Sequence, residues 1–228
     1  MAFFSMIDKK KYRKRQKGLF ITFEGPEGSG KTTQMAMLKD YFESRLMNCI
    51  VTREPGGTEL GEVIRKIVKY HAGSEKIHDE TELLLFAASR AQHVKNLIMP
   101  ALEEDKVVLC DRFLDSTTAY QGYARKLDLN FVDELNRFAI GPCMPDMTVL
   151  LDLNPEKGFE RTKERNPSLF KQDRIESESL EFHSKVRAAF LDIARKEPDR
   201  VKIVQADRPK ELIHCEIVEL VNNEFGPL

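Results

Sequence analysis

A loop that could hold phosphate groups lies near the start of the chain. Residues 25–32 read GPEGSGKT, which fits the pattern G-x-x-x-x-G-K-S/T at every fixed position. Glycines allow backbone amides to turn inward around a phosphate, and the helix that follows adds the positive end of its dipole. Lys31 is expected to reach the β and γ phosphates of a nucleoside triphosphate, and the Thr32 hydroxyl to ligate Mg²⁺. The candidate triphosphate ligands are Gly25, Pro26, Glu27, Gly28, Ser29, Gly30, Lys31, Thr32 and Thr33.

A second candidate pair, Asp111 and Arg112, directly follows an apolar run. An aspartate at the end of a buried strand can hold the metal ion of a bound nucleotide, and a neighbouring arginine can hold a phosphoryl group. A surface ion pair is the alternative interpretation. Asp152 also ends an apolar run and is the rival metal ligand, but a polar, aromatic stretch follows Asp111 and favours it. The predicted metal ligands are therefore Thr32 and Asp111.

Several arginines are spaced to provide a second anion site. Phosphoryl transfer consists mostly of positioning and charge neutralisation, so a second phosphate-bearing substrate needs further cations near the loop. Any single arginine is more often a solvated side chain, but we expect four to converge on one edge of the sheet: Arg53, Arg65, Arg90 and Arg112.

These residues must be positioned by strands and helices that alternate along the chain. Short apolar runs predict strands at 19–24, 50–54, 106–111, 147–153 and 201–205. Several are nearly continuous in Val, Ile and Leu, as in parallel strands buried on both faces. Helical patterns occupy 30–46, 58–70, 80–104, 114–125, 130–140, 155–164, 176–197 and 209–224. The alternation predicts an α/β fold, a doubly wound sheet of P-loop NTPase type with about five parallel strands, with ligands beyond the strands' carboxyl ends.

Composition argues against several other classes. The chain has 228 residues and a formal net charge of −1, which suits one domain and gives no overall field for nucleic acid or a membrane. No apolar run approaches the roughly 20 residues needed to cross a bilayer. The cysteines form no CxxC pair, which favours reduced thiols in a cytoplasmic protein over disulfides or a zinc site: Cys49, Cys110, Cys143 and Cys215.

The N-terminal segment differs from the rest of the chain. Residues 9–17 read KKKYRKRQK, and such a charge block is typical of a solvated, disordered tail. A contact with nucleic acid or a membrane is the alternative. We therefore separate a basic tail at 1–17 from a domain at 18–228.

The longer motifs together resemble the thymidylate kinase family, in its bacterial type. They occur in the family's order: FEGPEGSGKTTQ at 23–34, TREPGGTELGEVIRK at 52–66, LLLFAASRAQHV at 83–94, DRFLDSTTAYQGYAR at 111–125 and DRIESESLEFHSKVR at 173–187. The resemblance covers nearly the whole chain from Gly18 onward. It implies a nucleoside monophosphate kinase that phosphorylates dTMP to dTDP by in-line transfer from ATP, with Mg²⁺, in dTTP biosynthesis. It also implies a homodimer packed through helices.

The same resemblance implies roles in an acceptor site. Phe86 would stack on thymine, and Arg90, one helical turn later, would hydrogen-bond a base carbonyl. Arg65 would bind the 5'-phosphate of dTMP, and Arg112 would approach that phosphate and the transferring group. The remaining dTMP contacts would be Glu27 at the sugar 3'-hydroxyl, Thr117 and Gln121 at the base, and Tyr120, in the bulky run that would exclude a ribose 2'-hydroxyl.

Residues 164–175 resemble the family's lid over ATP. One branch of the family has an arginine directly after the loop carboxylate, where this chain has Gly28. The missing charge must then come from Arg165, Lys171 or Arg174, and Arg174 is the preferred candidate. A solvated charged loop is the alternative. The expected catalytic residues are Glu27, Lys31, Asp111, Arg112 and Arg174.

Two other functions stay open at this stage. Another nucleotide or nucleoside kinase on the same scaffold is the nearest alternative. A GTPase-like switch or nucleotide sensor is the second, although the chain has no NKxD run for reading guanine. The contacts to adenine are not assigned.

Overall fold

The structure is a computed structural model that describes residues 18–71, 73–165 and 173–226. The basic tail predicted at 1–17 and residues 166–172 of the predicted lid lie outside the described residues.

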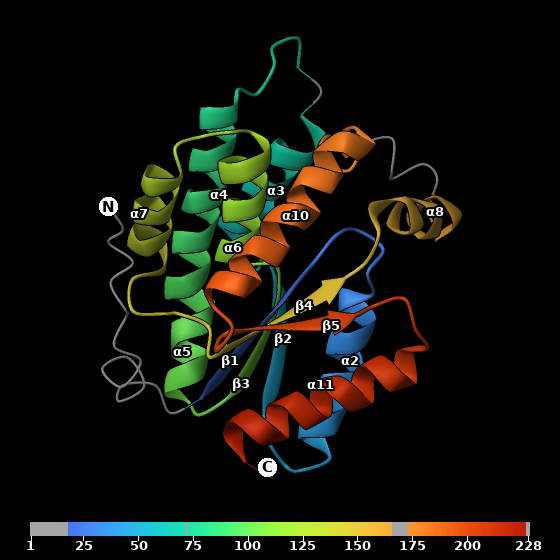
Figure 1. Ribbon diagram of the computed structural model, residues 1–228. Helices are drawn as coiled ribbons and strands as arrows, with labels where there is room; N and C mark the ends of the chain where they lie inside the picture. The colour runs from blue at the N-terminus through green and yellow to red at the C-terminus, as the bar shows by residue number, and fades with distance from the viewer. Residues whose placement is uncertain (1–17, 72, 166–172, 227–228) are drawn as a thin grey trace.

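A five-stranded parallel sheet forms the centre of the molecule, in the order β2-β3-β1-β4-β5 (Figure 1). All four neighbouring pairs are parallel. The three inner strands are almost entirely buried, which explains their continuous apolar runs. The predicted α/β fold with about five parallel strands is therefore confirmed. The strands are β1 (Leu19–Glu24), β2 (Cys49–Arg53), β3 (Val107–Asp111), β4 (Met147–Asp152) and β5 (Val201–Gln205).

Helices cover both faces of this sheet (Figure 1). Helices α2 (Lys31–Glu43) and α11 (Lys210–Phe225) pack on one face, where Ile21 and Phe23 of β1 point into the core. Phe20, from the same strand, points to the opposite face. Because successive side chains of a strand point to opposite faces of the sheet, each face has its own apolar core. The other helices are α3 (Glu59–Tyr70), α4 (Asp79–His93), α5 (Met99–Glu103), α6 (Leu114–Thr117), α7 (Leu129–Ile140), α8 (Pro155–Arg165) and α10 (Leu180–Lys196).

Two predicted helices contain π-helical turns instead of running as regular α-helices. The helix predicted at 80–104 consists of α4, a π-helix η1 (Val94–Ile98) and α5. Pro100, inside this stretch, has no N–H to donate, so the regular hydrogen-bond ladder has to change close to it. The helix predicted at 114–125 consists of α6 and a second π-helix, η2 (Thr118–Ala124).

The helix predicted at 176–197 begins later than expected, at Leu180. Ser179 has extended backbone angles, and its hydroxyl accepts a hydrogen bond from the Phe182 amide at 3.2 Å. This side-chain cap fixes the first turn of α10.

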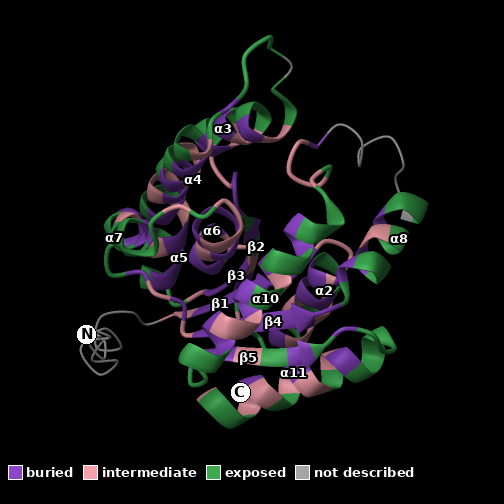
Figure 2. Ribbon diagram, turned by 45° about the horizontal axis from the view of Figure 1, so that its top comes forward, coloured by how far each residue is buried: buried purple, intermediate pink, exposed green. Residues whose placement is uncertain are grey.

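Burial follows the layers of the fold. Figure 2 shows the inner strands and the inward helix faces buried, whereas the outer helix faces are exposed. Among residues 18–71, 73–165 and 173–226, no helix combines the length and apolarity that a membrane crossing requires.

Candidate active site

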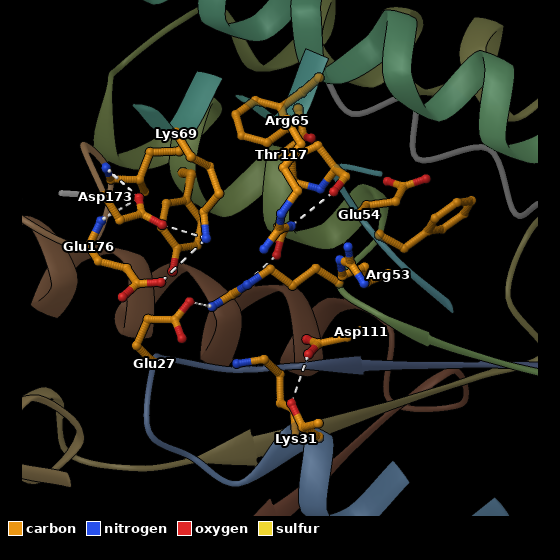
Figure 3. Close-up of a pocket in the computed structure, with 18 of the residues that line it drawn as sticks. Glu27, Lys31, Arg53, Glu54, Arg65, Lys69, Asp111, Thr117, Asp173 and Glu176 are labelled. Atoms are coloured by element: carbon orange, nitrogen blue, oxygen red, sulfur yellow. Dashed lines mark hydrogen bonds and ion pairs between the residues drawn. The ribbon is translucent and has the colours of Figure 1, made fainter. Parts of the chain in front are cut away.

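A cavity of about 280 Å³ lies beyond the carboxyl ends of the inner strands. Its wall comes from the phosphate loop, the ends of β2 and β3, helices α3 and α4, the π-helix η2 and residues 173–176. In Figure 3, Lys31 and Asp111 lie on one side of this cavity, and Arg65 and Lys69 on the other. The predicted site residues that line it are Glu27, Gly28, Gly30, Lys31, Thr32, Thr33, Arg65, Phe86, Arg90, Asp111, Arg112, Thr117, Tyr120 and Gln121.

The phosphate loop curls around the Lys31 side chain. The Lys31 ammonium donates to the carbonyls of Gly25 at 3.3 Å and Pro26 at 3.1 Å. Gly25 has a φ of 133°, and a Cβ there would meet the Leu151 carbonyl oxygen at 2.3 Å. Only glycine fits this turn. Burial and the nearby Arg112 lower the pKa of Lys31 below its usual value.

The predicted metal ligands lie side by side. The Thr32 hydroxyl donates to Asp111 Oδ2 at 3.4 Å, and the buried Asp111 Oδ1 has no hydrogen-bond partner among the described residues. Such an orphan carboxylate oxygen fits a cation. The rival Asp152 instead forms a two-pronged pair with Arg187 at 2.7 and 2.9 Å. The described residues contain no cluster of three His, Cys, Asp or Glu for a metal, so Mg²⁺ would also need phosphate oxygens.

Arg112 holds the loop carboxylate. Its guanidinium donates to Glu27 Oε1 at 2.7 Å and to the Ser116 hydroxyl at 3.2 Å. Burial by itself would raise the pKa of Glu27, but the charges of Arg112, Lys31 and Lys69 hold it well below its usual value. The negative charge of Glu27 within the loop is therefore stabilised by the three neighbouring cations.

The backbone at Arg112 has an unusual conformation. Its φ is 67°, in the left-handed region that favours glycine. Glu24, fully buried at the end of β1, fixes the turn that follows: it accepts bonds from the amides of Phe113 at 2.8 Å and Ser116 at 3.1 Å. Its other oxygen accepts from the Ser116 hydroxyl at 2.6 Å. Sequence reasoning missed Glu24, although an acid ending an apolar strand was a visible signal.

Arg90 is held by protein groups on several sides. It is 1% exposed, and its Nε donates to Glu54 at 2.8 Å. Its terminal nitrogens donate to Asn136 at 2.7 Å, to the Phe113 carbonyl at 3.1 Å and to the Thr117 hydroxyl at 2.9 Å. The guanidinium therefore meets the cavity in one orientation. Glu54, which lies in the TREPGG motif, was also missed by sequence reasoning.

The remaining cavity cations are on α3 and at the end of β2. Arg65 donates to the Pro55 carbonyl at 2.9 Å, and Arg53 pairs with Glu62 at the rim. Lys69, one turn after Arg65, pairs with Asp173 and with Glu176, the latter at 3.4 Å. Lys69 was not predicted, although its spacing from Arg65 places both on one helix face.

The structure does not bring Arg174 into the cavity. Its guanidinium donates to the Val68 carbonyl at 3.1 Å and to the buried Glu82 carboxylate. Its catalytic role stays a prediction. Lys171 and the side chain of Arg165, the other candidates, lie outside the described residues.

An arginine on α8 joins three segments beside the phosphate loop. Arg161 of α8 donates to the carbonyls of Ala206 at 3.2 Å and Gly28 at 3.4 Å, and pairs with Asp207 at 3.3 Å. It thus connects α8 to the phosphate loop and to the turn after β5.

Known proteins are similar to this chain in sequence and in fold. The family model for thymidylate kinase matches residues 23–217. A thymidylate kinase of Bacillus cytotoxicus is 45% identical over 209 residues, covering 92% of this chain and 99% of the relative. One of Syntrophotalea carbinolica is 50% identical over 190 residues, covering 82% and 88%. The crystal structure of thymidylate kinase from Ehrlichia chaffeensis superposes with a TM-score of 0.72 at 34% identity, covering 90% of this chain and 98% of that one. This chain therefore belongs to the thymidylate kinase family of enzymes.

Proposed function

We propose that this enzyme phosphorylates dTMP to dTDP with ATP as the donor and Mg²⁺ as the cofactor, as a step in dTTP synthesis. One observation supports the proposal above all others. The phosphate loop with Asp111 and the arginines Arg65, Arg90 and Arg112 line one cavity. Two anionic substrates could therefore meet between them.

The phosphate loop would bind ATP, the phosphoryl donor. Its residues Gly25–Thr33 would hold the ATP phosphates, with Lys31 at the β and γ groups. Thr32 and Asp111 would hold the Mg²⁺ ion, which would supply positive charge to neutralise the ATP phosphates. The acceptor oxygen of dTMP would attack the γ phosphorus in line as the bond to ADP breaks, so no covalent enzyme intermediate is needed.

The opposite wall of the cavity would bind dTMP, the phosphoryl acceptor. Arg65 would bind the dTMP phosphate, and Arg112, already next to Glu27, would contact both the acceptor phosphate and the transferring group. Phe86 would stack on the thymine ring. Arg90 and Gln121 would contact its polar edge, with Thr117 and Tyr120 completing the wall.

We also propose that the enzyme is a cytoplasmic homodimer. Helix α3 exposes an apolar stripe whose spacing of three, four and three residues follows one helix face: Leu60, Val63, Ile67 and Tyr70. Such a patch on a small protein fits an interface with a second copy. All four cysteines are free, which supports a reducing compartment. We propose no nucleic-acid or membrane partner.

A coupled kinase assay against thymidine, dTMP, UMP and dCMP tests the main proposal. We expect dTMP to have the highest kcat/KM with ATP, and omission of Mg²⁺ to abolish turnover. A higher kcat/KM for another acceptor would refute the substrate assignment. Binding of ATP without formation of any nucleoside diphosphate would refute the enzymatic assignment and favour a sensor.

A further inference from the structure

The amide of Gln121 is held by a buried acid. Gln121, on η2, is 1% exposed and lines the cavity. Its Nε2 donates to Glu82 Oε1 at 2.7 Å. Glu82 lies on α4, is also 1% exposed and does not line the cavity. It therefore contacts the substrate pocket only through its neighbours.

Glu82 has two cationic partners in addition to Gln121. Arg125 donates to its two oxygens at 3.4 Å each, and Arg174 donates to Oε2. Burial by itself would raise the pKa of Glu82, but Arg125, the Gln121 hydrogen bond and Arg174 together lower it below its usual value. The carboxylate is thus ionised at neutral pH and has no hydrogen to donate.

Because the Glu82 carboxylate can only accept hydrogen bonds, it determines the orientation of the Gln121 side-chain amide. Because the group facing a carboxylate must be a donor, the amide nitrogen points to Glu82 and the oxygen takes the other position. Within the described part of the chain, no protein group donates to that Oε1. Gln121 therefore presents a fixed acceptor to the cavity that it lines together with Arg90. Protein acceptors that the structure describes take four of the five N–H groups of Arg90, so one N–H on its Nη1 is left for a ligand.

An acceptor from Gln121 beside a donor from Arg90 would distinguish thymine from cytosine. Thymine carries an N3–H donor beside an O4 acceptor, which complements a glutamine oxygen and an arginine. Cytosine carries the reverse, an N3 acceptor beside an N4 amino donor. A wrongly paired buried donor or acceptor is strongly disfavoured, since it loses its hydration without gaining a partner.

We propose that Glu82 is a positioning residue that sets the specificity for thymine over cytosine by fixing the orientation of the Gln121 amide. The inference rests on the proposed function, since it concerns the acceptor of that reaction. Glu82 acts through Gln121 and does not touch the substrate.

Glu82→Gln tests the inference. A glutamine at 82 keeps the shape but offers both a donor and an acceptor, so the Gln121 amide becomes free to turn. We expect the ratio of kcat/KM for dTMP to that for dCMP to fall at least about tenfold, since one mismatched buried hydrogen bond is worth about 1.4 kcal/mol or more. The KM for ATP, which binds at the loop, should stay unchanged.

Glu178→Gln is the matched control. Glu178 pairs with the same Arg125 at 2.6 Å but has no contact with Gln121 among the described interactions. If the specificity depended only on the general order of the charged cluster around Arg125, both variants would have a lower ratio of kcat/KM for dTMP to that for dCMP. We expect instead that this ratio is unchanged in Glu178→Gln. In a Gln121→Met background, Glu82→Gln should have no further effect on the ratio.

A ratio in Glu82→Gln within twofold of wild type would overturn the inference. If circular dichroism shows that this variant does not fold, Glu82→Asp takes its place, because its shorter carboxylate no longer reaches the Gln121 amide. A preserved ratio there overturns the inference, and a tenfold loss that is absent in the Gln121→Met background supports it. A wild-type enzyme that does not prefer dTMP would instead overturn the proposed function, so the two failures are distinguishable.

Discussion

Lys31 is the residue whose charge acts most directly on the phosphates in the proposed reaction. Its ammonium lies inside the loop, within hydrogen-bond distance of the Gly25 and Pro26 carbonyls. We expect Lys31→Ala to lower kcat by about 10²–10³, because Lys31 stabilises charge that develops during transfer. Binding of dTMP should change little. Steady-state kinetics with a dTMP titration checks this, with Lys39→Ala, an ion-paired lysine farther along the same helix, as the control. Near wild-type kcat in Lys31→Ala would exclude the role.

Glu24 gives the folded protein a pH dependence of stability. Burial, and then the charge of Asp115, raise the pKa of Glu24 from 4.5 to about 7. The folded state therefore binds a proton here that the unfolded state has released. The stability from this group is complete below about pH 4.5 and is lost as the pH rises through about 7.

Replacing Glu24 removes this dependence. From about pH 5 to pH 8, we expect the free energy of unfolding in urea to fall less for Glu24→Gln than for wild type. Glu104→Gln, at an exposed glutamate, should follow the wild-type curve. Parallel curves for wild type and Glu24→Gln would show that Glu24 does not titrate in this range.

Sequence reasoning identified the site residues whose motifs have a known chemistry and missed the buried acids that support them. The loop and the DR pair could be predicted because their residue types and spacing indicate phosphate and metal binding, even though their mutual contacts are 79 and 85 positions apart. The roles of Glu24 and Glu54 could not be predicted in the same way, although Glu24 visibly ends an apolar strand, because they depend on partners 89 and 36 positions away. Arg174 is a similar case, since its pairing with Glu82 depends on a contact 92 positions distant.

At the level of secondary structure, the start of α10 depends on one hydroxyl. Ser179 accepts from the Phe182 amide at 3.2 Å, and an alanine would leave that amide without this partner. We expect Ser179→Ala to lower the free energy of unfolding by about 1 kcal/mol. Urea unfolding measures this. Ser184→Ala is the control, because that exposed serine bonds only within the helix, to the Leu180 carbonyl at 2.8 Å. Equal effects in both variants would argue against the cap.

The strands were easier to predict than the helix ends. Parallel strands buried on both faces require continuous apolar runs, and the chain supplies them with boundaries within about a residue of those observed. Helix ends depend on single caps and on tertiary packing. The π-helices η1 and η2 follow no simple periodicity, so a pattern of i, i+3 and i+4 positions describes them as ordinary helix.

For the whole molecule, the exposed stripe on α3 predicts how two copies associate. We expect Ile67→Lys to shift the proposed dimer to monomer, because an ammonium would be buried without a partner in the interface. Sedimentation velocity over a concentration series measures this. Leu46→Lys, at a leucine that is 96% exposed and outside the stripe, should leave the assembly unchanged. A wild-type monomer would exclude the dimer, and a dimeric Ile67→Lys would place the interface elsewhere.

The left-handed backbone at Arg112 means that the proposed phosphate contact and the backbone conformation favour different side chains at one position. A non-glycine residue there costs about 1–2 kcal/mol, which the hydrogen bonds that Phe113 and Ser116 donate to Glu24 help to offset. Glycine would suit the backbone, yet it would leave Glu27 without its partner and the pocket without a guanidinium. Relief of the backbone strain in Arg112→Gly is therefore opposed by the loss of the Glu27 ion pair, and a library at position 112 that is scored for both heat resistance and turnover would separate these two contributions.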